Sequence, residues 1–292
     1  MNSLPIEKRV QIIQLLVEEN SMRSVERIVG CSINTVTKLL CDVGAACTEF
    51  QDGAMRNLNC KRVQCDEIWS FVYAKERNVP EDLKDVFGIG DVYTWTSIDA
   101  ETKLVPSWFV GTRGLESAKL FISDLAGRLA NRVQLTTDGH KAYLEAVEQS
   151  LHGDIDYAML IKIYGESPKE DRRRYSLTEY KGFTKGVVSG NPEKAHISTS
   201  VVERQNLTLR MHMRRFTRLT NGFSKKVENH ANAVALHFMY YNFAKIHKTL
   251  RVTPAMDAGI SDHVWSIEEI ARLVPEPVAL KRGSYKKKDI SN

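Results

Sequence analysis

The sequence lacks a closely spaced cysteine pair. Its five cysteines are ten, six, thirteen and five positions apart, so no C-x-x-C motif occurs. Structural zinc sites use such pairs, and we therefore expect reduced thiols that pack in the core rather than a zinc finger. A signal peptide and a long apolar run are missing as well. These absences predict a cytoplasmic, nucleoid-associated protein with no membrane partner.

The chain also has no glycine-rich phosphate loop. FGIGD, at 87–91, is too short and lacks a following helix, which argues against a sugar-metabolic α/β enzyme. Positive charge is only slightly in excess, with a formal net charge of +5 and a pI near 8.8. The basic residues are clustered, however, at 204–226 and in the tail KRGSYKKK. This clustering, rather than the total charge, indicates a polyanionic partner.

Two aspartates lie where a sheet protein would present a site. Residues 63–75 mix β-branched and aromatic side chains and predict a strand that contains Asp66. Residues 132–137 predict a shorter strand that stops at Asp138, before a helical pattern over 140–151. Ligand sites in open α/β sheets gather at the carboxyl ends of strands, so Asp138 would lie at such an end. Asp66 would instead lie within its strand and point to one face.

A third acid, Glu203, has two interpretations. Ser200-Val-Val-Glu203 fits the capping box that starts a helix, in which the carboxylate only accepts a hydrogen bond from a backbone N–H. The other interpretation is a metal ligand beside a phosphate backbone. Between Thr199 and Lys226, Glu203 is the single acid among five arginines and two lysines, a local charge of +6. A solvated helix face usually interleaves both signs, so this segment favours the metal ligand.

The motifs around these acids resemble those of DDE transposases of the insertion sequence 1 family, whose core is RNase H-like, as in retroviral integrases. They are CDEIWSFV around Asp66, TTDGHKAY around Asp138, and VERQNLTLRMHMRRFTRLTNGFSK from Glu203. The resemblance covers roughly residues 60–250. Arg210 follows Glu203 by two helical turns, so the two should share a helix face, as the Glu and the basic residue do in many such transposases.

The resemblance implies a polynucleotidyl transferase in which Asp66, Asp138 and Glu203 are the catalytic and metal-binding residues. They would hold two Mg²⁺ (or Mn²⁺) ions, which activate water to nick the element end and then the 3′-hydroxyl that attacks target DNA. Asn206 would contact phosphate or orient the helix, and His140 would lie near the second acid. The partners would be double-stranded DNA, as element ends and as target, and a homodimer or higher assembly on DNA. The arginines expected to contact DNA are Arg204, Arg210, Arg214, Arg215 and Arg218.

The N-terminal segment predicts a helix-turn-helix. Residues 6–19 place apolar side chains at three-to-four spacing, as in an amphipathic helix. Residues 24–29 would form a short second helix, Gly30 the turn, and Ser32 the cap of a third helix over 33–42. The start of that helix would enter the major groove. The residues expected to face DNA are Asn34, Thr35, Thr37 and Lys38. The alternative is a small helical bundle that only supports the core.

The whole pattern predicts an α/β protein: an RNase H-like mixed-sheet catalytic core with an N-terminal helix-turn-helix and a C-terminal helical segment. Further strands are expected at 91–99, 103–112 and 157–164, the last being the final strand, and helices at 115–130 and 227–248. Residues 165–198 predict a long charged loop that could reach DNA. The expected divisions are a DNA-binding domain at 1–48, a linker at 49–60, a catalytic domain at 61–222, a helical segment at 223–275 and a disordered basic tail at 276–292.

Two rival functions remain open. A metal-dependent nuclease or resolvase on the same fold would use the same carboxylates without strand transfer. A catalytically inactive regulator derived from a transposase would bind DNA through the helix-turn-helix alone. The three intact acids argue against the regulator, and the helix-turn-helix together with the arginine-rich helix favours a transposase over the nuclease.

Overall fold

The computed structural model describes residues 4–165, 180–217 and 221–275 of the 292-residue chain. A mixed β-sheet lies at its centre. Its strands within these residues are β1 (Arg62–Val72), β2 (Gly90–Asp99), β3 (Trp108–Gly111), β4 (Gln134–Thr137), β5 (Asp156–Tyr164) and β6 (Tyr180–Ser189). They run in the order β3-β2-β1-β4-β5-β6. β4 is parallel to both of its neighbours, and every other pair is antiparallel. The expected α/β class is thus confirmed.

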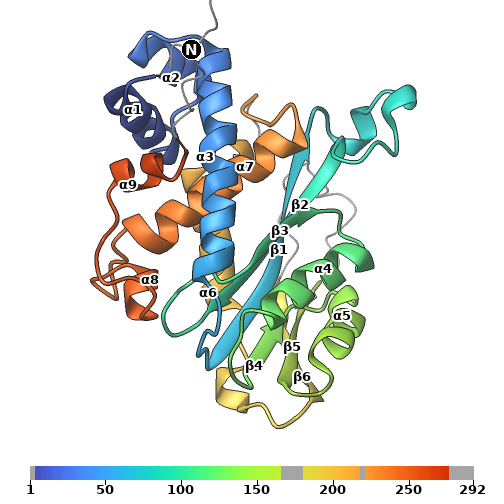
Figure 1. Cartoon of the computed structure of the whole chain (residues 1–292). Helices are drawn as coiled ribbons and strands as arrows, with labels where there is room; N and C mark the ends of the chain where they lie inside the picture. The colour runs from blue at the N-terminus through green and yellow to red at the C-terminus, as the bar shows by residue number, and fades with distance from the viewer. Residues whose placement is uncertain (1–3, 166–179, 218–220, 276–292) are drawn as a thin grey trace, which may run out of the picture.

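Helices cover both faces of this sheet (Figure 1). On one face lie α4 (Leu115–Ala126) and α5 (Ala142–Leu151). On the other lies α6 (Ser200–His212), with α3 (Ile33–Ala54) and α7 (Val227–Met239) packed beside it. The remaining helices are α1 (Ile6–Val17), α2 (Met22–Val29), α8 (Pro254–Asp257) and α9 (Ile267–Arg272). Among the described helices none alone is long and apolar enough to cross a membrane, and only α2 and α3 taken together, bent by 114°, meet that test.

Three helices form at the N-terminus, close to the predicted positions. Ser21 caps α2 and Ser32 caps α3, each through its side-chain oxygen, and Gly30 ends α2 with a φ of +67°. α3 is much longer than predicted, because it continues past residue 42 and through half of the expected linker. Gly44 lies within this continuation, and a Cβ at Gly44 would lie 2.5 Å from Cβ of Asn232, so the glycine allows α3 and α7 to cross closely. It is a packing residue inside the helix.

The strand and helix order follows the sequence prediction as far as β5, with shorter β3 and α4 than expected. The prediction of a loop over 165–198 was wrong, because β6 lies within it and pairs with β5. β5 is therefore not the last strand. β6 was missed because it is an edge strand whose residues are largely exposed, so it has no buried face to produce an alternating pattern. Residues 166–179 of the predicted loop lie outside the described residues.

The C-terminal helical segment contributes to the hydrophobic core. The expected helix over 227–248 ends as an α-helix at Met239 and continues as one π-helical turn, Tyr240–Ala244. Phe238 and Phe243 of this segment are buried. Arg9 of α1 donates to the carbonyl oxygen of Ala271 in α9 at 2.6 Å, which ties the two ends of the described chain together.

All five cysteines are free thiols. Cys47, Cys60 and Cys65 are buried in the core, as expected for packing residues. Burial raises the pKa of Cys47 and of Cys60 to about 12. These thiols therefore remain protonated and unreactive at neutral pH.

Candidate active site

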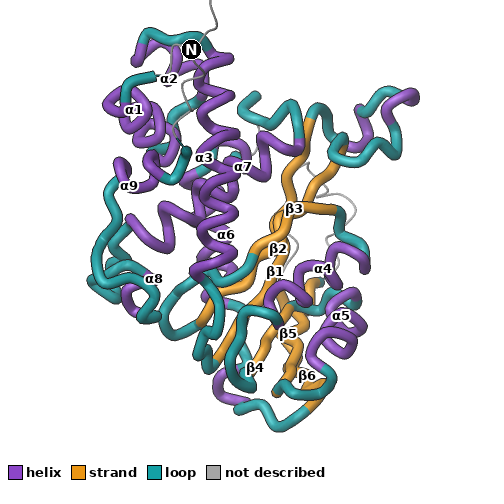
Figure 2. The backbone as a smooth tube through the Cα atoms, viewed as in Figure 1, coloured by secondary structure: helices purple, strands orange, loops and turns teal. Residues whose placement is uncertain are grey.

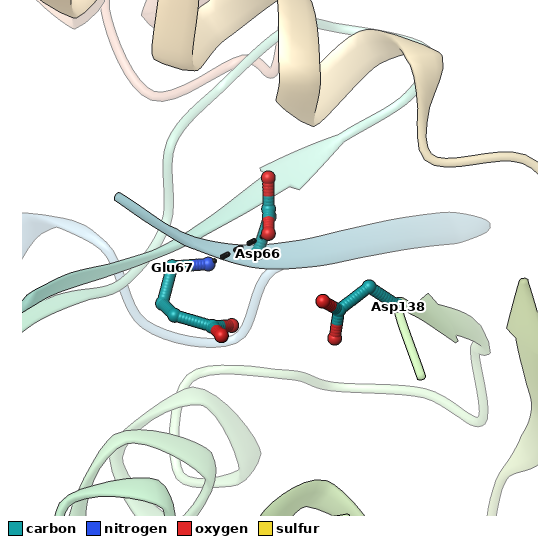
Figure 3. Close-up of side chains that lie close together, drawn as sticks. All are labelled: Asp66, Glu67 and Asp138. Carbon is teal, nitrogen blue, oxygen red and sulfur yellow. Dashed lines mark hydrogen bonds between the residues drawn. The ribbon is translucent and has the colours of Figure 1, made fainter. Parts of the chain in front are cut away.

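Two of the three predicted acids converge where β4 ends. Thr137, the last residue of β4, pairs with Cys65 of β1, so Asp138 leaves the sheet directly beside Asp66. β1 runs on past this point, where it pairs with β2 and is bridged at Val72 to Ser224 (Figure 2). One carboxylate oxygen from each of Asp66, Asp138 and Glu67 lies within 4.8 Å of the other two. This cluster of three acids is the candidate metal centre (Figure 3).

Each aspartate is fixed by hydrogen bonds to its carboxylate. Oδ1 of Asp66 accepts from the backbone N–H of Glu67 at 2.9 Å, and Oδ2 accepts from Nδ2 of Asn206 at 2.8 Å. Oδ1 of Asp138 accepts from the backbone N–H of His140 at 2.9 Å. His140 is therefore close to the second acid, as the resemblance suggested. Its imidazole Nε2, however, lies 3.0 Å from the carbonyl oxygen of Arg113.

Glu67 is a site residue that the sequence analysis missed. It points to the opposite side of β1 from Asp66 (Figure 3), as the alternation of a strand requires. Its side chain is only 1% exposed, and Arg113 donates to Oε1 through Nε at 2.8 Å. Tyr143 of α5 donates to Oε2 at 3.4 Å. The available signal was the second acid of CDEIW, because two adjacent carboxylates are unusual in a strand that is otherwise buried.

The cluster holds more negative charge than its protein neighbours neutralise. Burial, with the nearby charges of Glu67 and Asp138, raises the pKa of Asp66 to about 7. Burial and Asp138 raise the pKa of Glu67 to about 7, even though the Arg113 guanidinium opposes this shift. Carboxylates with raised pKa values are stabilised in their ionised form by a bound cation. The arrangement is therefore chemically suited to a divalent cation.

Glu203 faces the same cavity but lies outside the 4.8 Å cluster formed by the described residues. Its Oε2 lies 2.6 Å from Nζ of Lys162 on β5, and its Oε1 accepts from the Thr199 hydroxyl at 2.5 Å. The N-cap of α6 is Thr199, whereas Ser200 is already helical. The capping-box interpretation is therefore wrong, because the Glu203 carboxylate bonds to side chains.

A cavity of about 950 Å³ connects these groups. One face of α6 lines it with Glu203, Asn206, Leu207 and Arg210, so the predicted shared face of Glu203 and Arg210 is confirmed. Asn206 is buried, and its Oδ1 has no hydrogen-bond partner among the described residues. The cavity is thus lined by the acids, by an amide oxygen without a partner among the described residues, and by cationic side chains from β5, α6 and the turn before α4.

The arginines after Glu203 occupy different environments. Arg204 and Arg214 are exposed, and Arg210 lines the cavity. Arg215 instead donates to Oγ of Ser224 at 2.6 Å and lies 3.3 Å from the Met22 sulfur. Burial lowers the pKa of Arg215 to about 10, so its position suits packing against the N-terminal helices better than contact with phosphate. Arg218 lies outside the described residues.

The predicted DNA-facing residues of α3 lie at the surface. Asn34 and Lys38 are exposed, whereas Thr35 and Thr37 are half-buried. Thr37 donates its hydroxyl to the carbonyl oxygen of Ile33 at 2.8 Å. Three of the four, Asn34, Thr35 and Lys38, line a groove between α3 and the last described residues of the chain. The first turns of α3 therefore present small polar and basic groups.

Comparison with known proteins confirms the family resemblance. The family model described as IS1 transposase matches residues 172–245, about a quarter of the chain, including Glu203 and the arginine-rich segment. A search of curated proteins returned no match. Among solved structures, a cryo-EM structure of a piggyBac transposase synaptic complex with hairpin DNA aligns at 10% identity and a TM-score of 0.46. That alignment covers 96% of this chain and 75% of the other, and its TM-score is too low to establish a common fold.

Proposed function

We propose that this chain is a DNA transposase that binds element ends and catalyses metal-dependent strand cleavage and strand transfer. The observation that carries the proposal is the convergence of Asp66 and Asp138 at the end of β4, in a cavity that Glu203 and Arg210 also line. The family match over 172–245 independently supports a transposase. A nucleophilic serine, cysteine or tyrosine is not required by this chemistry.

An RNase H-like core fits the topology. Three antiparallel strands, a helix, a parallel strand, a helix and another parallel strand precede the Glu203 helix. The sheet order β3-β2-β1-β4-β5 puts β1 and β4 side by side, so the two aspartates meet although 72 positions separate them. β6 is an addition at the β5 edge.

The donor set fits Mg²⁺ or Mn²⁺. Asp66 and Asp138, with Glu67 beside them, offer hard oxygen donors, and one oxygen from each lies within 4.8 Å of the others. The unpartnered amide oxygen of Asn206 is a further hard donor beside Asp66. When bound, the metal would activate the attacking oxygen and stabilise the leaving oxygen at phosphorus. The protein's part is to hold the carboxylates, bring phosphate against Arg210 and Lys162, and align the strand.

Glu203 is the proposed third catalytic acid, and Glu67 is its competitor. Glu67 is already within the cluster, but Arg113 and Tyr143 satisfy its carboxylate, and it is almost fully buried. Glu203 is 39% exposed, and its charge is close enough to contribute to the raised pKa of Asp66. Because phosphate must reach the site from solvent, the more accessible carboxylate is the better candidate. Glu67 then acts as a buried support for the aspartates.

Sequence-specific recognition of double-stranded element ends is assigned to the N-terminal helices. A bend of 114° between α2 and α3, with a three-residue turn that begins at Gly30, supports a helix-turn-helix. Contact with α7 and α9 is equally compatible with the supporting-bundle alternative. Backbone contacts to element and target DNA are assigned to the exposed arginines of the α6 segment. We further propose a homodimer or higher assembly on DNA, in the cytoplasm at the nucleoid.

The experiment is a cleavage and strand-transfer assay with Mg²⁺ on DNA that carries the element ends. Wild type is compared with Glu203→Gln and Glu67→Gln, each of which removes a charge at nearly constant size. Glu145→Gln is the matched control, because Glu145 forms a 2.9 Å helix-surface ion pair with Lys119 outside the site. DNA binding is measured in parallel by fluorescence anisotropy.

Four outcomes separate the alternatives. Loss of both reactions in Glu203→Gln, with DNA binding and the Glu145 control intact, supports the proposal. Loss in Glu67→Gln alone would assign the third acid to Glu67. Cleavage without joining by wild type would identify a nuclease or resolvase. Binding without either reaction would identify an inactive regulator.

A further inference from the structure

The outer half of the β5–β6 hairpin carries aromatic side chains that nothing in the described protein covers. Tyr164, Tyr180 and Phe183 are 55%, 54% and 52% exposed. The rings of Tyr164 and Tyr180 meet edge to face at a centroid distance of 6.1 Å. Large aromatics normally bury their rings, so a cluster left open on one hairpin indicates a binding surface.

Strand register places these rings on one face, together with two lysines. Lys162 is directly opposite Phe183 and Tyr164 is opposite Tyr180, and paired residues in an antiparallel ladder share a face. Lys185 extends this face, with its Nζ 5.8 Å from the Phe183 ring centroid. We call Lys162, Tyr164, Tyr180, Phe183 and Lys185 the hairpin face.

The hairpin face is continuous with the candidate active site. Lys162 and Tyr164 line the cavity that holds Asp66, and Lys162 also contacts Glu203. The described outer hairpin, 159–165 and 180–187, contains three lysines and no acid. A DNA strand that runs from the carboxylates along the hairpin face therefore meets positively charged side chains first and exposed aromatic rings next.

We propose that the hairpin face binds unpaired nucleotides next to the reacting phosphate by stacking their bases on Tyr164, Tyr180 and Phe183. This inference rests on the proposed function and names the form of DNA that the site takes. Bases in an intact duplex are stacked on one another and cannot offer their faces to a ring, whereas unpaired bases can. Lys162 and Lys185 then meet the phosphates, as in other stacking grooves for single strands.

The size of the face sets the length of the unpaired segment. Lys162 and Tyr164 are two positions apart, which is about 7 Å along β5. Stacked nucleotides advance by about 3.4 Å each. The face therefore accommodates about two or three nucleotides, so a short overhang or a locally opened end is the expected partner.

The test compares binding of two DNAs in EDTA, where no cleavage occurs. One is a blunt duplex that carries the element end, and the other is the same duplex with a three-nucleotide single-stranded overhang containing 2-aminopurine. Variants are Phe183→Ala, Phe183→Trp, which keeps a stacking ring, and Ile163→Ala. Ile163 is the matched control, because it is 46% exposed on the opposite face of the same hairpin.

Stacking predicts quenching of 2-aminopurine by wild type. Phe183→Ala should weaken overhang binding about tenfold while blunt-duplex affinity stays within twofold, and Phe183→Trp should restore both binding and quenching. Ile163→Ala should change neither DNA affinity. Equal weakening on both DNAs, or no weakening, overturns the proposal. Conversion of a dimer to a monomer by Phe183→Ala, seen by light scattering without a DNA effect, would assign the face to a second copy of the chain.

Failure of the proposed function would look different. Quenching and overhang preference without any Mg²⁺-dependent cleavage would leave the stacking face standing and reject catalysis. Cleavage and joining without overhang preference would reject the stacking face alone. Binding to neither DNA would reject both.

Discussion

Replacing Glu67 with glutamine should stabilise the metal-free protein at pH 7.5. The change removes one of three carboxylates, one oxygen of each lying within 4.8 Å of the others. At an effective dielectric constant of about 20, two unit charges at that distance repel by about 3.5 kcal/mol. Partial protonation reduces this repulsion, because Asp66 and Glu67 have pKa values of about 7. The half-exposed ion pair with Arg113 is lost, which costs up to about 1 kcal/mol. We expect a net gain of about 1–2 kcal/mol.

The assay is thermal unfolding in EDTA at pH 7.5 and at pH 5. A gain of this size corresponds to a rise in Tm of about 2–3 °C at pH 7.5 for a chain of 292 residues, because the entropy of unfolding is about 2.1 cal/mol/K per residue. At pH 5 the rise should disappear, because the folded wild type already holds protons on Asp66 and Glu67 below pH 7 and has little repulsion to relieve. Glu145→Gln, which changes an exposed ion pair with Lys119, should stay within about 0.5 kcal/mol at both pH values.

A loss of stability of equal size at both pH values would refute this reasoning. It would mean that the contacts of Glu67 with Arg113 and Tyr143 outweigh its repulsion by the aspartates. The three acids would then be a self-neutralised structural cluster, and the case for a cation between them would lose its electrostatic basis.

Three further predictions concern protonation, charge and packing. Without divalent cations, the free energy of unfolding should fall as pH rises from about 4 to about 7. The folded-state pKa of Asp66 lies above its ordinary value, so the folded protein binds more protons than the unfolded chain across this window. Asp66→Asn should make the free energy of unfolding, measured by urea titration, less dependent on pH. Lys162→Gln should lower the slope of log affinity against log salt by about 1 in DNA-binding titrations, if Lys162 reaches phosphate. Gly44→Ala should cost about 1–3 kcal/mol in urea unfolding, because its Cβ would meet Asn232 at 2.5 Å, whereas Gly53→Ala in the same helix, with nothing within 4 Å, should be neutral or slightly stabilising.

The interior of the fold was predictable because its signals are local. β1 has β-branched and aromatic residues in an unbroken run, and α5 follows a turn signal at Asp138-Gly139, so both were placed within a few residues. The end of α3 was not predictable in this way. Whether Gly44 interrupts a helix depends on what approaches it, and its neighbour Asn232 is 188 positions away in sequence.

β6, at the edge of the sheet, was also not predictable from its own sequence. YKGFTKGVVS has two glycines, and its aromatic and basic residues show no buried face. Its strand conformation comes from hydrogen bonds to β5, which the sequence of β6 alone does not reveal. The residues that make this strand hard to predict, exposed rings beside lysines, are the ones that make it a candidate for contact with DNA.

The candidate site also has a part that was predictable from the sequence and a part that was not. Asp66 and Asp138 could be paired from topology, because adjacent parallel strands bring their residues together. The position of Glu203 depends on contacts between residues far apart in sequence: Asn206 donates to Asp66, and Gln64 of β1 accepts from two backbone N–H groups in the first turn of α6. Asn206 is one helical turn beyond Glu203 on the same cavity-lining face, so a side-chain rotation rather than a helix shift would bring the Glu203 carboxylate towards the aspartates. Lys162 now holds that carboxylate at 2.6 Å. We therefore expect cation binding and phosphate binding to be coupled: if Glu203 turned inward to help hold a metal, Lys162 would be released for the DNA backbone.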